Sequence, residues 1–330
     1  MRPALLAGLT GLLIAAVLLP HAQGQSPGVC QPAANALGVS RVIDIDTTQG
    51  PIFGSSPAAK HDLLRDHEVV LTFDDGPHAA YTKPILDALD AHCTKATFFM
   101  VGWRALTQSR LVREVAHRGH TVATHTWSHQ NVAKLDPVAA RAEIELGISA
   151  VQRALGSPAA PFFRFPYLSE PRAMVAHLKS RNTGIFAIDI DSIDYRTRSP
   201  TMMVRNVMQQ LAVKGKGIIL MHDIQPATAG GIKMLLAELK AGGYMVVHLR
   251  PTRGQVTVAE FDRQVDRDRA RRRIASLPVP VGQRGIVSPA WEVNVFRSPQ
   301  AGLGGSAATA PTAERPSALD DWRHSIFRTW

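Results

Sequence analysis

Two adjacent carboxylates stand in the first of five short clusters that could bind a metal ion or move protons. The cluster reads TFDDGP over residues 72–77 and follows an apolar run, so Asp74 and Asp75 are neighbours. Two such charges repel each other unless a cation or a proton lies between them. At a strand end they can diverge, so that one binds a metal while the other faces a substrate. The alternative is a polar turn in which Asp75 caps the next helix.

A second cluster, HTWSH, spans residues 125–129 and places His125 and His129 four positions apart. On a helix such residues share one face, and neutral imidazole is a common zinc ligand. The pair alone is a weak signal, and no glutamate follows His125, so it is not the metalloprotease motif HExxH. Two histidines and an aspartate from another strand end would make a three-ligand site with an open position, as catalytic zinc has.

The third cluster places an arginine in an apolar run. Arg164 stands within FFRFPY at residues 162–167. A buried arginine needs a carboxylate partner, and Asp74 or a neighbour is the obvious candidate. The alternative is an arginine whose charged end reaches the surface.

The last two clusters also close apolar runs. Residues 189–195 read DIDSIDY, and residues 220–223 read LMHD. His222 lies at a strand end with carboxylates nearby, which makes it a candidate general acid or base. Either cluster could instead be a capping or hydrogen-bonded turn.

The elements that would position these clusters alternate between strands and helices. Between the expected strands, apolar residues recur at spacings of three and four, which indicates helices. This alternation predicts a parallel sheet, either a barrel or a doubly wound sheet. Reactive groups gather at the carboxyl ends of strands in such folds, so we expect the clusters to meet. The expected strands are residues 42–45, 69–73, 96–101, 121–124, 162–165, 185–190, 217–221 and 244–249.

Taken together and in order, the clusters resemble the signature of the polysaccharide deacetylase family, also called the NodB-homology domain or carbohydrate esterase family 4. The family motifs TFDDG, H[ST]xxH, RxP[YF], DxxDW and LxHD match this chain between Thr72 and Asp223. One departure is Tyr195, where the family usually has tryptophan, and it affects the sugar-binding groove more than the chemistry. The resemblance covers residues 41–250 and implies an α/β fold, a distorted (β/α) barrel of about seven parallel strands.

The resemblance also implies roles for individual residues. The metal ligands would be Asp75, His125 and His129, and the ion would be Zn²⁺ or another divalent transition metal. The groups implied in catalysis are Asp74 as general base, Arg164 as its partner, His222 as general acid, Asp194 as the partner of His222, and the backbone N–H of Tyr167 in the oxyanion hole. Substrate contacts would come from Tyr195 and from Leu220, which would line the pocket for the acetyl methyl group.

The implied activity is removal of acetyl groups from N-acetylated sugars of a polysaccharide or oligosaccharide, and O-acetyl groups could be removed in the same way. Metal-activated water, an aspartate base and a histidine acid would carry it out. The rival interpretations are a non-catalytic glycan-binding protein on the same fold and a deacetylase of a non-sugar amide. The expected partner is an acetylated glycan, and peptidoglycan, chitin oligosaccharide, xylan and exopolysaccharide all stay open.

Composition limits the class and the compartment of the protein. The 330 residues include 45% hydrophobic and 19% charged residues, with a formal net charge of +10. This is ordinary globular composition, and without a concentrated basic run before residue 250 no nucleic-acid partner is expected. Residues 1–24 combine a basic start, an apolar run and a small-residue cleavage pattern, which predicts a secretory signal peptide. An uncleaved anchor is the alternative. We therefore expect a periplasmic or secreted protein.

The flanking segments complete the expected organisation. An N-terminal arm covers residues 25–40, and residues 251–330 begin with an Arg-rich, solvated helix and continue as a mostly disordered tail. The tail could make a weak contact with cell wall or membrane surface, although a solvated appendage is commoner. Cys30 and Cys93 are expected to form a disulfide in an oxidising compartment, with two free thiols as the alternative.

Overall fold

The computed structural model describes residues 30, 36–59 and 62–275. The chain divides into two compact units, Met1–Gln31 and Pro32–Trp330, and all the helices and strands below belong to the second. The predicted signal peptide and the tail beyond residue 275 lie outside the described residues. Within the described part, no helix combines the length and the apolar character that crossing a membrane requires.

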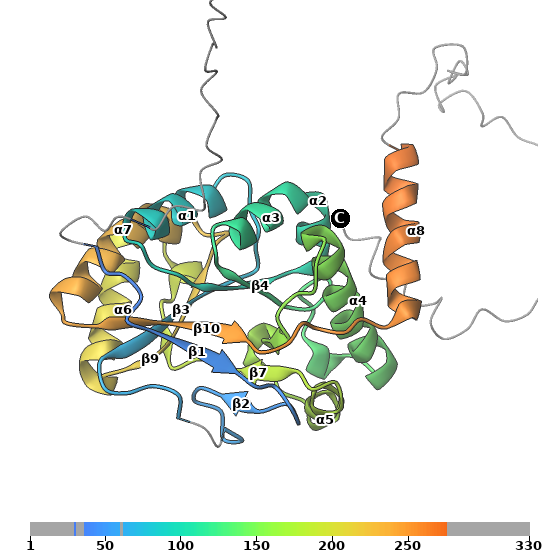
Figure 1. Ribbon diagram of the computed structural model, residues 1–330, viewed down its shortest axis with the longest axis horizontal. Coiled ribbons are helices and arrows are strands. Elements are labelled where there is room, and N and C mark those ends of the chain that lie inside the picture. Colours follow the sequence, from blue (N-terminus) through green and yellow to red (C-terminus); the bar gives the residue numbers. More distant parts are fainter. Residues whose placement is uncertain (1–29, 31–35, 60–61, 276–330) are drawn as a thin grey trace, which may run out of the picture. The chain divides into compact units, whose positions relative to one another are not determined.

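A parallel β-sheet runs through the second unit (Figure 1). Its order is β1-β10-β3-β4-β5-β6-β7-β2, and β9 also pairs with β3 and β8. Because no pairing among the described strands joins β2 to β8, the sheet does not close. The parallel α/β fold expected from the sequence is confirmed. The strands are β1 (Arg41–Ile45), β2 (Ile52–Phe53), β3 (Glu68–Asp74), β4 (Thr97–Met100), β5 (Thr121–Thr124), β6 (Phe162–Phe163), β7 (Gly184–Phe186), β8 (Ile190–Asp191), β9 (Gly217–His222) and β10 (Met245–Pro251).

Helices cover the sheet, and α4 is capped at both ends. The side chain of Asp136 accepts hydrogen bonds at the start of α4, and Gly156 ends that helix with a φ of 82°. The α-helices are α1 (Thr82–Ala91), α2 (Gly102–Thr107), α3 (Ser109–His117), α4 (Pro137–Leu155), α5 (Arg172–Ser180), α6 (Pro200–Lys214), α7 (Pro226–Ala241) and α8 (Ala259–Ala275). Short 3₁₀ helices are η1 (Val132–Lys134), η2 (Pro166–Leu168) and η3 (Asp194–Arg196).

Strand β3 is buried along its whole length and separates two apolar clusters. Val69, Leu71 and Phe73 pack on the helix side, whereas Val70 belongs to the cluster on the opposite face. Because side chains alternate along a strand, Asp74 shares the face of Val70. The alternation therefore turns Asp74 away from the helices and into the interior of the curved sheet.

The prediction of one continuous strand over residues 185–190 is wrong, because two short strands, β7 and β8, lie there. The chain pairs β7 with β6 and then crosses to pair β8 with β9. The break occurs because the carbonyl oxygens of Phe186 and Ala187 accept hydrogen bonds from the Arg164 side chain instead of continuing a ladder. The two-residue strand β2 was not expected at all, since it is too short to show a period.

The Arg-rich segment after residue 250 forms α8, but it is not solvated on all sides. Phe261 and Val265 are buried and pack with Trp127 and Leu146, the latter on α4. An ion pair also joins Arg153 to Asp266 at 2.6 Å. The apolar positions are few, and the density of charge in the sequence concealed them.

Both cysteines, Cys30 and Cys93, are disulfide-bonded. The expectation of a disulfide is therefore confirmed.

Candidate metal and catalytic site

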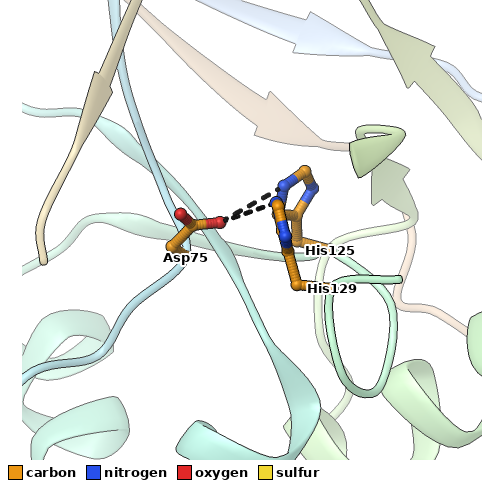
Figure 2. Close-up of side chains that lie close together, drawn as sticks. All are labelled: Asp75, His125 and His129. Atoms are coloured by element: carbon orange, nitrogen blue, oxygen red, sulfur yellow. Dashed lines mark ion pairs between the residues drawn. The ribbon is translucent and has the colours of Figure 1, made fainter. Parts of the chain in front are cut away.

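Asp75, His125 and His129 form a compact group beyond the ends of β3 and β5. Figure 2 shows the carboxylate of Asp75 directed at the two imidazole rings. Asp75 Oδ1 lies 3.2 Å from His129 Nε2 and 3.5 Å from His125 Nε2, and one ligand atom from each residue lies within 4.8 Å of the others. Asp75 Oδ1 is buried and accepts no hydrogen bond from the described residues. A buried carboxylate oxygen facing two imidazole nitrogens suits a divalent transition metal ion.

The segment that carries the two histidines is a loop rather than the helix on which their spacing was first considered. Thr126 and His129 have φ values of 63° and 65°, and the Thr126 hydroxyl accepts a hydrogen bond from the backbone N–H of His129 at 3.0 Å. His125 Nδ1–H donates to the carbonyl of Arg164 at 2.7 Å. Because Nδ1 carries the proton, Nε2 keeps its lone pair and can bind a metal ion. Burial lowers the pKa of His125 well below its usual value, which keeps the ring neutral as a metal ligand must be.

Glu143 on α4 supports this loop and was not predicted from the sequence. Its carboxylate is fully buried and accepts hydrogen bonds from the backbone N–H of Ser128 at 2.9 Å and from the Ser128 hydroxyl at 2.8 Å. Its carbonyl accepts another from Trp127 N–H at 2.8 Å. One turn further along, Gly147 lies so close that an added Cβ would sit 2.4 Å from the carbonyl carbon of Thr126. The sequence does carry one signal for this role, because Glu143 is a charged residue on a helix face that is otherwise mostly apolar.

Arg164 holds Asp74 in the interior of the sheet. Its guanidinium is fully buried, donates to Asp74 Oδ1 at 2.7 Å and to the Thr72 hydroxyl at 2.8 Å, and lies 4.3 Å from the centre of the Phe99 ring. Asp74 Oδ2 is left facing His125 Nε2 at 3.8 Å. Burial raises the pKa of Asp74 to about 6, although the charge of Arg164 opposes the rise. This second oxygen therefore faces the candidate metal site and can take a proton.

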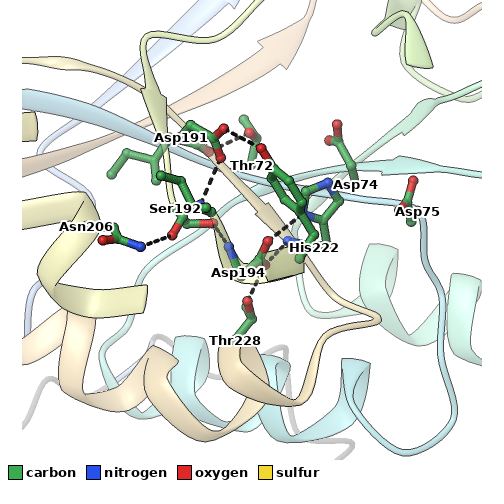
Figure 3. Close-up of polar contacts among 12 residues, drawn as sticks. Thr72, Asp74, Asp75, Asp191, Ser192, Asp194, Asn206, His222 and Thr228 are labelled. Carbon is green, nitrogen blue, oxygen red and sulfur yellow. Dashed lines mark hydrogen bonds and ion pairs between the residues drawn. The ribbon is translucent and has the colours of Figure 1, made fainter. Parts of the chain in front are cut away.

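His222 at the end of β9 is held by Asp194, the first residue of η3 (Figure 3). His222 Nδ1–H donates to Asp194 Oδ1 at 2.7 Å, and the backbone N–H of His222 donates to Asp194 Oδ2 at 2.7 Å. The Thr228 hydroxyl also donates to Oδ2. Burial disfavours the charged ring, but the hydrogen bond and charge of Asp194 outweigh it and raise the pKa of His222 to about 9. His222 is thus a protonated group at neutral pH.

Tyr167, expected in the oxyanion hole, and the expected substrate contacts Tyr195 and Leu220 lie near these groups. Tyr167 is 67% exposed, and the centre of its ring lies 4.9 Å from that of His129. The Tyr195 ring lies 5.7 Å from the His222 ring, centre to centre, in an edge-on arrangement. Leu220 is buried two positions before His222 on β9. The structure therefore brings every sequence-predicted site residue to one edge of the sheet.

Asp223 is a further residue that no role was predicted for, although it ends the LMHD cluster. Its carboxyl is buried, accepts a hydrogen bond from the Thr82 hydroxyl at 2.6 Å, and leaves Oδ1 without a partner among the described residues. A Cβ on Gly76 would lie 2.1 Å from this carboxyl, so only glycine fits the turn that follows Asp75. Burial raises the pKa of Asp223 to about 7. The residue fixes the turn that directs Asp75.

Comparison with known proteins agrees with this site. A family model described as polysaccharide deacetylase matches residues 63–184. The chain is 30% identical over 167 residues to a chitooligosaccharide deacetylase of a Bradyrhizobium species, which covers 50% of this chain and 74% of that protein. The chain belongs to the polysaccharide deacetylase family. Within this family it is also 32% identical over 186 residues to a peptidoglycan-N-acetylglucosamine deacetylase of Bacillus cereus, covering 55% of this chain and 66% of that one.

A solved member of the polysaccharide deacetylase family shares the fold. A peptidoglycan deacetylase of Bdellovibrio bacteriovorus superposes with a TM-score of 0.60 and 35% identity, covering 67% of this chain and 61% of that chain. The present chain thus spans somewhat less than two thirds of both this protein and the Bacillus cereus relative.

Proposed function

We propose that this protein is an exported, metal-dependent deacetylase that hydrolyses acetyl groups from N-acetylated sugars of a glycan. The observation that carries the proposal is the group Asp75, His125 and His129 with Asp74 and His222 beside it. Asp74 is a carboxylate above pH 6 and His222 a cation below pH 9. A base and an acid on either side of one metal site are what amide hydrolysis requires.

The ligands would hold Zn²⁺, which when bound polarises a carbonyl and lowers the pKa of water. Asp74 Oδ2 takes the proton from the attacking water. Arg164 donates a hydrogen bond to Oδ1 and so fixes the orientation of the carboxylate. The backbone N–H of Tyr167 stabilises the developing oxyanion. Leu220 accommodates the acetyl methyl group.

His222 completes the reaction from the other side of the acetyl group. Asp194 holds its Nδ1–H, so that Nε2–H is the proton available for transfer. Nε2–H protonates the amine as the carbon–nitrogen bond breaks, because an unprotonated amine is a very poor leaving group. The products are acetate and a free amino sugar. Tyr195 forms part of the wall against which the sugar rests.

Export rests on residues 1–24 as a signal peptide, with residues 25–40 as an arm and residues 41–250 as the catalytic domain. The disulfide supports this, because disulfides persist in oxidising compartments. The protein would therefore work in the periplasm or outside the cell, where acetylated glycans occur.

The test is acetate release from a panel of acetylated glycans by the mature chain, with added Zn²⁺ and with chelator. Asp74→Asn keeps the shape of the side chain and removes the base. Release that needs both the metal and Asp74 supports the proposal and names the glycan. Binding of a glycan without release, by folded and metal-loaded protein, would instead identify a glycan-binding protein. Release only from a non-sugar amide would point to the third interpretation.

A further inference from the structure

A cavity of about 760 Å³ opens next to His222, and among its lining residues only Tyr195 has a part in the function proposed above. We call it the cationic pocket, and it is lined by Tyr81, Tyr195, Arg196, Arg198, Gln225 and Pro226, with two neighbouring residues. It adjoins the site directly, since Tyr195 contacts the His222 ring and the backbone N–H of Gln225 donates to the His222 carbonyl at 3.1 Å. A glycan placed for deacetylation would extend into this pocket.

The charged residues that line the pocket are both arginines. Arg196 and Arg198 are exposed, and in the described part of the chain neither forms an ion pair with a carboxylate. The Arg196 guanidinium lies 5.5 Å from the centre of the Tyr195 ring. The nearby carboxylates are already engaged: Asp191 accepts from the Tyr195 hydroxyl at 3.0 Å, and Asp194 is held by His222. The donors of both arginines are free for a ligand.

The start of one helix adds to the positive potential. Gln225 is the N-cap of α7, a helix of 16 residues, and both Gln225 and Pro226 line the pocket. The N-terminus of a helix carries a partial positive charge and attracts anions. The side chain of Gln225 makes no capping hydrogen bond. Two guanidinium groups and the N-terminus of α7 therefore meet at one cavity.

We propose that the cationic pocket binds a carboxylate on the sugar unit next to the one that is deacetylated. This deepens the proposed function and rests on it. Arginine binds carboxylates through paired hydrogen bonds, and the exposed Tyr195 beside them can contact the sugar. A neutral N-acetylglucosamine oligomer supplies no such charge. Peptidoglycan does: its alternate units carry a lactyl group whose carboxylate is free where the peptide stem is absent. Where the stem is attached, that carboxyl is an amide and the negative charge lies on the carboxylates of the stem.

The experiment compares kcat/KM for acetate release from two glycans of equal length. One is a neutral N-acetylglucosamine oligomer, and the other is a peptide-free peptidoglycan fragment with its lactyl carboxylates. A third glycan keeps the peptide stem, and a fourth is the peptide-free fragment with its carboxylates methyl-esterified. The enzymes are the wild-type mature chain, the double variant Arg196→Gln/Arg198→Gln, and Arg205→Gln, which removes an exposed arginine of α6 outside the pocket.

We expect wild type to prefer the carboxylate-bearing fragment, with the preference reduced by salt and by esterification. The double variant should reduce the ratio of acidic to neutral kcat/KM about tenfold, mainly through KM, because two charge-assisted contacts are lost. Arg205→Gln should keep the ratio. A preference seen only with the peptide stem would assign the pocket to stem carboxylates rather than to the lactyl group.

An unchanged ratio in an active double variant overturns the pocket proposal and leaves the deacetylase intact. If wild type is inactive on every glycan, the proposed function fails instead. The pocket is then judged by calorimetric binding of the peptide-free fragment, which the double variant must weaken about tenfold and esterification must abolish if the pocket is a carboxylate site. Equal binding by wild type and variant overturns it.

Discussion

Asp74 is buried and His222 is half-buried, and their surroundings push the two pKa values apart. Burial raises the pKa of Asp74 to about 6, and Arg164 keeps it from rising further. Burial alone would lower the pKa of His222, but Asp194 raises it to about 9. Because each group has a partner of opposite charge, each is ionised at neutral pH in the form that its role requires.

Asp194→Asn tests this arrangement at the level of a single group. Asparagine removes the negative charge that stabilises the His222 cation, so the pKa of His222 should fall. An acid must be protonated to act, and the wild-type rate should therefore decline as pH rises through about 9. In the variant this alkaline decline should begin at a lower pH. The measurement is kcat for acetate release between roughly pH 5 and 10.

Asp191→Asn is the control for that profile. Asp191 is close by but accepts from the Tyr195 hydroxyl rather than from His222. In the Asp191→Asn variant, kcat should decline at the same alkaline pH as in wild type. If the decline in Asp194→Asn also occurs at the wild-type pH, Asp194 does not set the pKa of His222.

Glu143→Gln tests whether the support beneath the histidines matters for the metal. An amide cannot accept from both the N–H and the hydroxyl of Ser128 as the carboxylate does. The loop between His125 and His129 should loosen, and Zn²⁺ affinity should fall about 10- to 100-fold. The measurement is competition with a chromogenic chelator.

Glu145→Gln supplies a matched comparison from the same helix. Glu145 is equally buried, but its ion pairs are with His177 and Arg181, and not with the loop of residues 125–129. This variant should lose stability and keep its Zn²⁺ affinity. Equal metal affinities in the two variants would refute a positioning role for Glu143.

At the scale of elements, Gly147 allows α4 to approach the loop of residues 125–129 closely. A Cβ there would lie 2.4 Å from the carbonyl carbon of Thr126, so the helix or the loop must move. Gly147→Ala should destabilise the protein by roughly 1–3 kcal/mol despite the better helix propensity of alanine. Urea unfolding measures the change.

Gly230→Ala on α7 is the comparison for that substitution. Its Cβ would meet only the Pro200 side chain, at 3.1 Å or more. Helix propensity should then offset most of the cost, leaving a change of under about 1 kcal/mol. If Gly147→Ala changes the free energy of unfolding as little as Gly230→Ala does, the close approach of α4 to Thr126 does not require glycine.

The strands that could be predicted are those whose side chains are apolar on both faces, such as β3 and β9. Their positions in turn made it possible to predict that Asp74, Asp75 and His222 meet at one edge. The division of residues 185–190 could not be predicted, because it depends on Arg164, which is distant in sequence. Glu143 and Thr228 escaped notice for the same reason, since their contacts arise only when helices pack. The loop form of HTWSH depends on those contacts as well.

At the scale of the molecule, α8 extends the packed structure beyond residue 250. Phe261 and Val265 pack against Trp127, which lies between His125 and His129 in sequence. Phe261→Ala should lower the free energy of unfolding by about 3 kcal/mol. It should also reduce acetate release, because Trp127 loses a neighbour. Urea unfolding and the activity assay together measure both effects.

Arg267→Ala, at an exposed position of the same helix, is the control and should change neither quantity. A chain ending at residue 250 should behave like Phe261→Ala or worse. If that truncated chain is as stable and as active as one ending at residue 275, α8 contributes nothing to the site.

Strand β3 has a consequence for the order of events during synthesis. It carries Asp74 and is hydrogen-bonded to β4, β9 and β10, and the Thr72 hydroxyl donates to the Ile219 carbonyl, 147 positions later. Pairing across so long a stretch forms slowly and only after the later partner exists. A growing chain therefore carries both aspartates long before they are placed. In the exported protein proposed above, this delay would leave the site unassembled while the chain is still being made.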